Sequence, residues 1–285
     1  MKIEYVVTKD SILKEYLKEI GLSRRFMKTV KLYGKMYIND CEVKNYFQVK
    51  VGDKITLEYN EEENENIITT ESNLDICYED EHILILNKPD YLAVQPSHKH
   101  YEENIVSYVK AYFKNNNIVS NVHIVNRLDY ATSGLMIVAK DGFTHFSLTK
   151  EKIITRKYLA IIKGIMDEKE GVINLPIKRE SEERDGNIKR IVASDGKEAI
   201  THYKVIKENK ENNLSLVDVK LDTGRTHQIR VHFKTLGYPL LGDKIYGEED
   251  ERLFLHCYHL SFINPFNNEE IIVEQIPDFE SKINF

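Results

Sequence analysis

The chain has 285 residues, is 41% hydrophobic and 30% charged, and carries a net charge of −6. These proportions are ordinary for a globular protein with one large core and a small second domain. The first residues are charged and lack an apolar core of signal-peptide length, and no run approaches a membrane-spanning length, so we expect a cytoplasmic protein with no membrane partner.

The charge is distributed unevenly along the chain. Its overall sign argues against a protein that binds nucleic acid. Residues 1–60, however, carry a net charge of +4, whereas residues 61–72 carry −5 and the remainder carries −5. Only the N-terminal segment therefore has a basic surplus.

The three cysteines are far apart in the sequence, and none belongs to a CxxC pair. They are Cys41, Cys77 and Cys257. This spacing predicts neither a zinc site nor a disulfide framework, and we expect buried thiols.

The N-terminal segment is predicted to contain two helices. Asp10 or Ser11 can cap the first helix, and Ser23 can cap the second, which Gly34 ends. Turn signals then separate short strands, so residues 1–60 are predicted to form two helices packed on a small sheet.

Basic side chains gather on the second helix. They lie off its apolar face and are Arg24, Arg25, Lys28 and Lys31. Such a cluster is either a solvated helix face or a surface that binds RNA phosphate groups.

The segment that follows is polar and rich in Glu, and it shows no apolar period. This composition is typical of a linker, so we place a domain boundary there. The predicted organisation is a small module of residues 1–60, an acidic linker of residues 61–72 and a larger domain of residues 73–285.

The larger domain is predicted to be rich in strands. Two strands, around Ile76 and over residues 83–86, precede a helix that Asn104 caps. Several strands beyond residue 150 alternate between inward and outward positions, which favours an antiparallel sheet. The predicted fold class is α+β, in which the small helical and β module precedes a mixed, mainly antiparallel sheet flanked by helices.

A polar loop stands out at the centre of the chain. Apolar runs on both sides frame residues 126–134, so two buried strands would hold this loop rigidly. If its first residues are extended, Arg127 and Asp129 face the same side and place a guanidinium beside a carboxylate. The pair suits a catalytic site, and it equally suits a structural ion pair.

A second polar segment lies near the C-terminus. Gly224 permits a tight turn, Thr226 can cap a helix, and Gly237 ends that helix. Arg230 projects from the helix off its buried face, where it can complete the surroundings of the carboxylate. The histidines of this region are not set in an HExxH frame, so we expect no metal.

Four segments resemble the motifs of the RluA-type pseudouridine synthases, in the family's order, over about residues 74–265. NRLDYATSGLMIVAK is similar to HRLDxxTSGLLVVAK, and TGRTHQIRVHFKTLGYPLLGDKIYG to TGRTHQIRVHLxxxGxPIxGDxxYG. The opening EDEHILILNKPDYLAVQPS and the strand RKYLAIIKG match EDExLLVVNKPxGLxVHPS and KxYxAxVxG. The chain departs from the family at Asn126 and Gln95, where His is usual or frequent, and at Tyr91, where Gly is usual.

This resemblance implies an RNA uridine isomerase that needs no cofactor and no metal. It implies that Asp129 is catalytic with Arg127 beside it, that Arg230 pairs with Asp129, and that Tyr158 packs against the target base. Asp129 acts as a nucleophile at C1′ or C6 or as a base at the 2′ position, and the sequence leaves these routes open. Taken alone, Tyr158 is more simply an aromatic residue of a strand.

The N-terminal module resembles the RNA-binding module of ribosomal protein S-four. The resemblance rests on SR at a helix start, a basic helix, a turn near Asn39-Asp40 and the letters VKVGDKI. We therefore expect a monomer whose partner is RNA, with large-subunit rRNA as the first choice of substrate and tRNA as the second. The alternative is a non-catalytic RNA-binding or ribosome-assembly protein, which has no need to keep Asp129, Arg230 and Tyr158 together.

Overall fold

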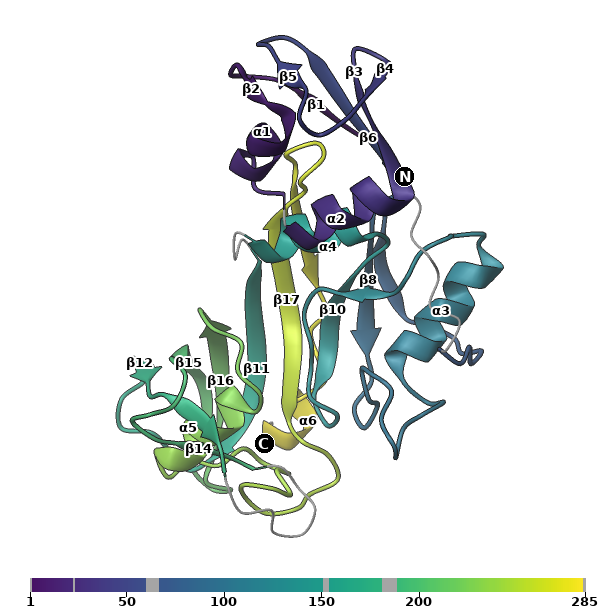
Figure 1. Cartoon of the computed structure of the whole chain (residues 1–285). Coiled ribbons are helices and arrows are strands. Elements are labelled where there is room, and N and C mark those ends of the chain that lie inside the picture. The colour runs from purple at the N-terminus through teal and green to yellow at the C-terminus, as the bar shows by residue number, and fades with distance from the viewer. Residues whose placement is uncertain (1, 23, 60–66, 151–153, 181–188, 284–285) are drawn as a thin grey trace.

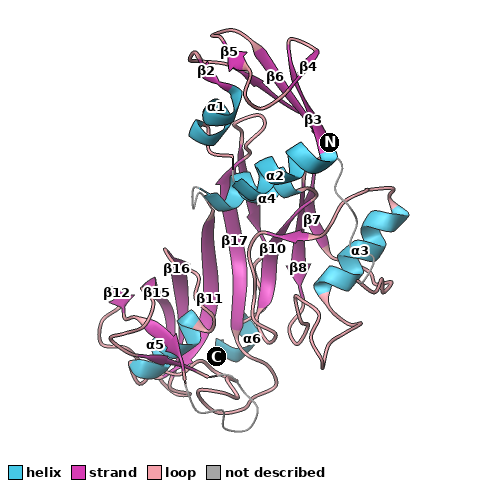
Figure 2. Ribbon diagram, viewed as in Figure 1, coloured by secondary structure: helices cyan, strands magenta, loops and turns pink. Residues whose placement is uncertain are grey.

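The structure is a computed structural model that describes residues 2–22, 24–59, 67–150, 154–180 and 189–283. Within these ranges a small N-terminal unit sits at one end of a large sheet (Figure 1). Strands outnumber helices, and the helices are short (Figure 2). The predicted α+β class with a mixed, mainly antiparallel sheet is confirmed.

The N-terminal unit is a four-stranded antiparallel sheet with two helices packed on it. The strand order is β1-β6-β3-β4, and a short ribbon pairs β2 with β5. The bounds are β1 (Lys2–Val6), β2 (Ser11–Ile12), α1 (Leu13–Glu19), α2 (Arg24–Tyr33), β3 (Gly34–Ile38), β4 (Cys41–Val43), β5 (Gln48–Val49) and β6 (Lys54–Tyr59). Leu13, Leu17, Val30, Ile55 and Leu57 are fully buried between the helices and the sheet.

The predicted helix caps are only partly correct. The residue before α1 is Ile12, which makes no side-chain capping bond, and Asp10 instead accepts a backbone hydrogen bond from the loop before β6. Ser23, the predicted cap of α2, lies outside the described residues. Asn104 does cap α3 (Ile105–Asn115), because its side chain accepts a hydrogen bond from the third backbone N–H beyond it.

A ten-stranded sheet carries the rest of the chain. Its order is β12-β15-β16-β11-β17-β10-β8-β7, with β18 paired to β17 and β9 paired to β10. The bounds are β7 (Ile76–Glu79), β8 (Ile83–Lys88), β9 (His123–Ile124), β10 (Ser133–Ala139), β11 (Thr155–Lys163), β12 (Glu170–Asn174), β15 (Ile200–Asn209), β16 (Leu214–Leu221), β17 (Leu255–Ile263) and β18 (Glu270–Glu274). Every pairing is antiparallel except that of β10 with β17.

The remaining elements are three helices and a separate two-stranded sheet of β13 and β14. They are α4 (Gly142–Lys150), β13 (Ile177–Arg179), β14 (Arg190–Val192), α5 (Gln228–Thr235) and α6 (Glu280–Ile283). None of the described helices is long and apolar enough to cross a membrane. The expectation of buried thiols is correct for Cys257 and wrong for Cys41, which is exposed, whereas Cys77 is half-buried.

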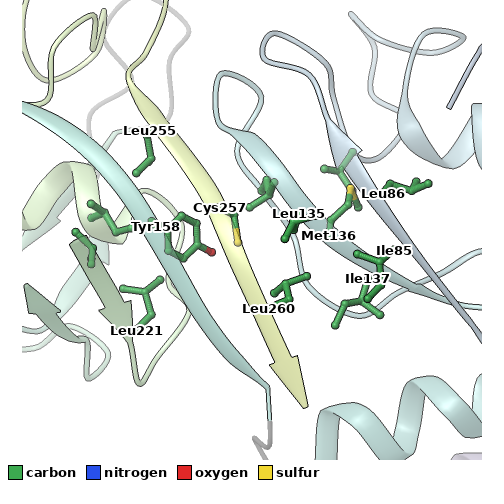
Figure 3. Packing of buried hydrophobic residues seen from close by; sticks show 14 of the residues in the cluster. Ile85, Leu86, Leu135, Met136, Ile137, Tyr158, Leu221, Leu255, Cys257 and Leu260 are labelled. Atoms are coloured by element: carbon green, nitrogen blue, oxygen red, sulfur yellow. The ribbon is translucent and has the colours of Figure 1, made fainter. Parts of the chain in front are cut away.

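The parallel contact of β10 with β17 fixes the middle of the core. All seven residues of β10 are buried, and Figure 3 shows Leu135 of β10, Cys257 of β17 and Tyr158 of β11 on three adjacent strands. Gly134 has φ +112°, and a Cβ there would lie 2.3 Å from the carbonyl oxygen of Cys257. Only glycine permits so close an approach, so the start of β10 is held tightly against β17.

Phe143 of α4 joins the N-terminal unit to the large sheet. Its ring packs against Tyr5 at 6.2 Å and Phe26 at 5.8 Å on one side, and against Phe266 of the β17–β18 turn at 5.8 Å on the other. In Figure 1, α2 lies beside α4 at this junction. The hydrophobic core of the N-terminal unit therefore includes a residue of the larger part of the chain.

Candidate active site

Asp129 lies in the loop between β9 and β10, on the wall of a cavity of ≈ 570 Å³. It is half-buried, and its backbone carbonyl accepts a hydrogen bond from the N–H of Thr132 at 3.1 Å. Asn126 attaches the start of this loop to β10, because its Oδ1 accepts the N–H of Ile137 at 2.6 Å. The departure from the family's His at Asn126 thus places a buried structural amide behind the carboxylate.

Lys88 contacts the middle of this loop and the segment that follows β8. Its side chain is fully buried at the end of β8, and Nζ donates to the carbonyls of Pro89 at 2.7 Å, Leu92 at 2.9 Å and Tyr130 at 3.3 Å. These three acceptors match the three protons of an ammonium group. Burial lowers the pKa of Lys88 to about 7, although the nearby carboxylates of Asp90 and Asp129 oppose the shift. The residue next to Asp129 is therefore fixed by a buried amine.

Arg230 of α5 bridges two carboxylates. Its Nη1 lies 3.5 Å from Oδ2 of Asp129, whereas Nε and Nη2 donate to Asp243 at 2.8 and 2.7 Å. Burial raises the pKa of Asp243, but the two hydrogen bonds from Arg230 outweigh it and the pKa lies below its usual value. The expected approach of Arg230 to Asp129 is present, and the stronger, bidentate partner is one that the sequence analysis missed.

His227 is a second neighbour of Asp129 that the sequence analysis missed. It replaces Thr226 as the residue before α5, and it has a left-handed backbone with φ 59°. Its Nε2 lies 3.8 Å from Oδ2 of Asp129, and its Nδ1 lies 2.8 Å from the hydroxyl of Tyr246. The family motif contained this histidine, but its letters do not say which way the side chain points.

Tyr158 forms part of the cavity wall on β11. Its side chain is only 5% exposed, and its hydroxyl points toward Cys257 (Figure 3). Burial raises the pKa of Tyr158 well above its usual value, so the hydroxyl stays protonated at neutral pH. The ring of Tyr158 and the carboxylate of Asp129 therefore line the same cavity.

The lining of the cavity is basic. Arg127, Arg156, Arg225 and Arg230 line it, and Asp129 is the single acid among the described lining residues. Arg127 is exposed, and no ion pair joins it to Asp129 within the part of the chain that the structure describes, so the predicted pair is not formed. A Cβ on Gly224 would lie 3.0 Å from Nη1 of Arg156. This glycine therefore leaves room for the guanidinium of Arg156.

The basic residues of α2 lie outside the cavity lining. Arg24, Lys28 and Lys31 are exposed, and the side chain of Arg25 falls outside what the structure describes. Arg24, Lys28 and Lys31 are therefore accessible to solvent or to a polyanion.

The histidines of the second polar segment are mostly structural. Nε2 of His232 lies 2.9 Å from the carbonyl of Leu175, and Nε2 of His256 lies 2.9 Å from that of Gln275. Because a carbonyl only accepts, these nitrogens carry a proton. Burial lowers the pKa of both histidines, so the rings are neutral donors at neutral pH. Among the described residues, no three His, Cys, Asp or Glu side chains are arranged to hold a metal ion.

Comparisons with known proteins all find RNA pseudouridine synthases. A family model described as RNA pseudouridylate synthase matches residues 82–235, more than half of the chain. The chain is 39% identical over 267 residues to an uncharacterized RNA pseudouridine synthase of Bacillus subtilis, covering 91% of this chain and 93% of the relative. It is 36% identical to the ribosomal large subunit pseudouridine synthase D of Buchnera aphidicola, covering 87% and 84%. A solved human structure, RNA pseudouridylate synthase domain containing 1, has a TM-score of 0.60 and 27% identity, covering 74% of this chain and 86% of the human chain.

Proposed function

The chain belongs to the RNA pseudouridylate synthase family, and from that premise we propose that it isomerises uridines of large-subunit ribosomal RNA to pseudouridine. The observation that carries this proposal is the position of Asp129, which faces the cavity next to Arg230 and shares its wall with Tyr158. Relatives named ribosomal large subunit pseudouridine synthase D support the choice of RNA. Transfer RNA is the second choice.

The reaction needs one carboxylate and no redox change. The N1–C1′ bond of uridine breaks, the uracil turns, and a C5–C1′ bond forms, while C5 loses a proton and N1 gains one. Asp129 serves as a nucleophile at C1′ or C6 or as a base at the 2′ position. In each route its ionised form is the reactive one, and the guanidinium of Arg230 stabilises that form.

The cavity is suited to a uracil base that has flipped out of its RNA stack. A volume of ≈ 570 Å³ accepts a nucleotide, and the Tyr158 ring offers a flat surface against which a flipped uracil packs. Because the hydroxyl of Tyr158 stays protonated, it can relay the C5 proton only by accepting one proton as it gives up its own. Arg156 and Arg127 line the same cavity, and we assign them to the phosphates that flank that nucleotide.

The N-terminal unit adds a second contact with RNA. We assign residues 1–60 as an RNA-binding module of the S-four type and residues 61–72 as its linker to a catalytic domain of residues 73–285. The exposed basic side chains of α2 support this assignment, since phosphate groups dominate the affinity of RNA-binding proteins. The enzyme would act as a monomer in the cytoplasm, where it meets ribosomal RNA.

Asp129→Asn tests the catalytic assignment. The variant keeps the shape of the side chain and removes its charge, so pseudouridine formation in cellular RNA should be lost by at least about a thousandfold. Asp167→Asn is the matched control, because Asp167 is exposed and outside the cavity lining. A folded Asp129→Asn enzyme with unchanged product, measured with a pseudouridine-specific chemical probe, contradicts the assignment. It would favour the alternative of a non-catalytic RNA-binding protein.

The RNA target is tested by mapping pseudouridines in total RNA from cells with and without the gene. We expect sites in large-subunit rRNA to disappear. If every lost site lies in tRNA, the substrate proposal is wrong while the chemistry stands.

A further inference from the structure

The two ring nitrogens of His227 face different groups. On one side, Nδ1 lies 2.8 Å from the hydroxyl oxygen of Tyr246, and on the other, Nε2 lies 3.8 Å from Oδ2 of Asp129. The same Tyr246 oxygen accepts the backbone N–H of Arg190 at 2.8 Å. A chain of contacts therefore runs from the backbone of the first residue of β14, through a tyrosine and an imidazole, to the carboxylate in the cavity.

The contacts at both ends of this chain select one tautomer. The oxygen of Tyr246 already accepts from Arg190, so its own proton is available for Nδ1 of His227. A carboxylate only accepts, so the nitrogen that faces Asp129 is favoured when it carries a proton. Both ends thus favour the tautomer in which Nδ1 carries no proton and Nε2 carries one.

The imidazole is also kept neutral. Burial lowers the pKa of His227, and the cations of Arg230 and Arg190 act in the same direction. The carboxylates of Asp129 and Asp243 oppose this shift without overcoming it. His227 therefore offers Asp129 an N–H group and no full positive charge at neutral pH.

The backbone explains how His227 reaches this position. Its φ of 59° and ψ of 18° are left-handed, a conformation that side chains with a Cβ rarely adopt and that persists where the surroundings enforce it. Arg230 follows three residues later, one turn into α5, and the nearest approach of both side chains to Asp129 is through Oδ2. The start of α5 thus places two donor groups near the same oxygen, Oδ2 of Asp129.

We propose that His227 is a positioning residue that donates its Nε2–H to Oδ2 of Asp129, with its tautomer fixed by Tyr246. This inference rests on the proposed role of Asp129. With Oδ2 held by His227 and Arg230, Oδ1 is turned to the substrate. The proposal requires the distance of 3.8 Å to shorten to a hydrogen bond in the complex with RNA, as catalytic contacts commonly do once substrate is bound. A neutral donor orients the carboxylate, whereas a second cation would reduce its nucleophilicity.

A matched pair of variants isolates the N–H group. His227→Gln places an amide N–H near the position of Nε2, and His227→Leu has a similar size and no donor. Both carry the same left-handed backbone penalty. We expect Leu to lower kcat by about tenfold to a hundredfold with KM little changed, and Gln to retain kcat within about threefold between pH 6 and pH 9. Equal kcat in the two variants overturns the proposal.

The tautomer itself is measured without turnover. In the full-length protein with ¹⁵N-labelled histidine, the His227 signals at pH 7.5 should show a protonated Nε2 and an unprotonated Nδ1. Tyr246→Phe should move them toward a mixture and lower kcat less than His227→Leu does. An Nδ1–H or doubly protonated ring in the wild type overturns the inference, even if His227→Leu fails to fold. Wild-type protein with the expected tautomer but no pseudouridine product would instead refute the proposed function.

Discussion

At the scale of single residues, the site is held together by groups with more than one partner. Arg230 is 4% exposed and Asp243 is 1% exposed, so the bidentate pair is shielded from water. Buried ion pairs add little stability over apolar packing, but removal of one partner leaves an uncompensated buried charge. Asp243 therefore fixes the orientation of the guanidinium that faces Asp129.

Asp243→Asn should be destabilising and should impair catalysis. We expect the free energy of unfolding to fall by about 3 kcal/mol, because Arg230 keeps its charge and loses its main acceptor. Urea denaturation measures this change, and kcat should fall with it, since Arg230 is free to turn. Asp195→Asn is the control, because Asp195 is 70% exposed and pairs only at the surface with Lys178. Equal stabilities of the two variants would contradict the role of Asp243.

Gly224→Ala should weaken RNA binding without unfolding the protein. The added Cβ meets the flexible end of Arg156, which moves aside rather than distorting the backbone. We expect KM for RNA to rise about three- to tenfold with kcat retained, and Arg156→Gln to behave alike. Lys157→Gln is the control, since Lys157 is next along β11 and does not line the cavity. An unchanged KM in both Gly224→Ala and Arg156→Gln would remove Arg156 from the substrate contacts.

At the scale of elements, α4 couples the N-terminal unit to the large sheet. Phe143 is 7% exposed and contacts rings from both sides of the junction, and Phe266 stacks in turn on His82 at 3.7 Å. This aromatic row holds the basic helix α2 in one orientation relative to the catalytic cavity. Under the proposed function, this fixed orientation keeps the RNA contact that we assign to α2 at a constant position relative to the cavity.

Phe143→Ala should loosen this junction. Truncation of a buried Phe costs about 3 kcal/mol, and here the loss falls on the contact between two parts of the chain. Hydrogen exchange should accelerate in α1 and α2 more than in β10 and β17. The exposed Phe47, at 52% exposure, provides the control Phe47→Ala. Uniform acceleration across the whole chain would mean that the two parts unfold as one unit.

At the scale of the whole molecule, positive charge is concentrated in two places. The net charge of −6 hides a basic N-terminal unit and a cavity lined by arginines. RNA affinity should therefore depend steeply on salt. Replacement of Arg24, Arg25, Lys28 and Lys31 by Ala should flatten the dependence of log Kd on log salt, measured on a long rRNA fragment. A slope equal to that of the wild type would contradict the role of the basic helix.

Buried neutral histidines should make the protein sensitive to acid. Burial lowers the pKa of His256 to about 4, and it also lowers the pKa values of His232 and His227. The unfolded chain takes up these protons near pH 6.5 and the folded chain does not, so stability present above pH 6.5 is lost as the pH falls toward 4. For His256 alone the loss at pH 5 is about 2 kcal/mol. Urea denaturation at pH 7.5 and pH 5 measures it, and His256→Gln should reduce the difference, unless other groups cause the acid sensitivity.

The sequence by itself determined the elements and the kinds of residue at the site. Apolar periodicity located β8, β10 and α3, because burial on one face imposes a local pattern that is visible in the letters. It missed β1, whose five residues alternate too briefly to stand out. Local motifs likewise singled out Asp129, Tyr158 and Arg230, which line one cavity.

The tertiary structure alone decided which of these side chains meet. Asp129 and Arg230 are about 100 residues apart, and the pairing of β10 with β17 and the packing of α5 bring them to 3.5 Å. The same packing pairs Arg230 with Asp243 and places His227 beside Asp129. It does not form the predicted contact between Arg127 and Asp129. Side-chain direction depends on rotamers and on neighbours from distant strands, so no local pattern records it. Gly224 shows this most simply, since the arginine that needs its missing Cβ lies on another strand.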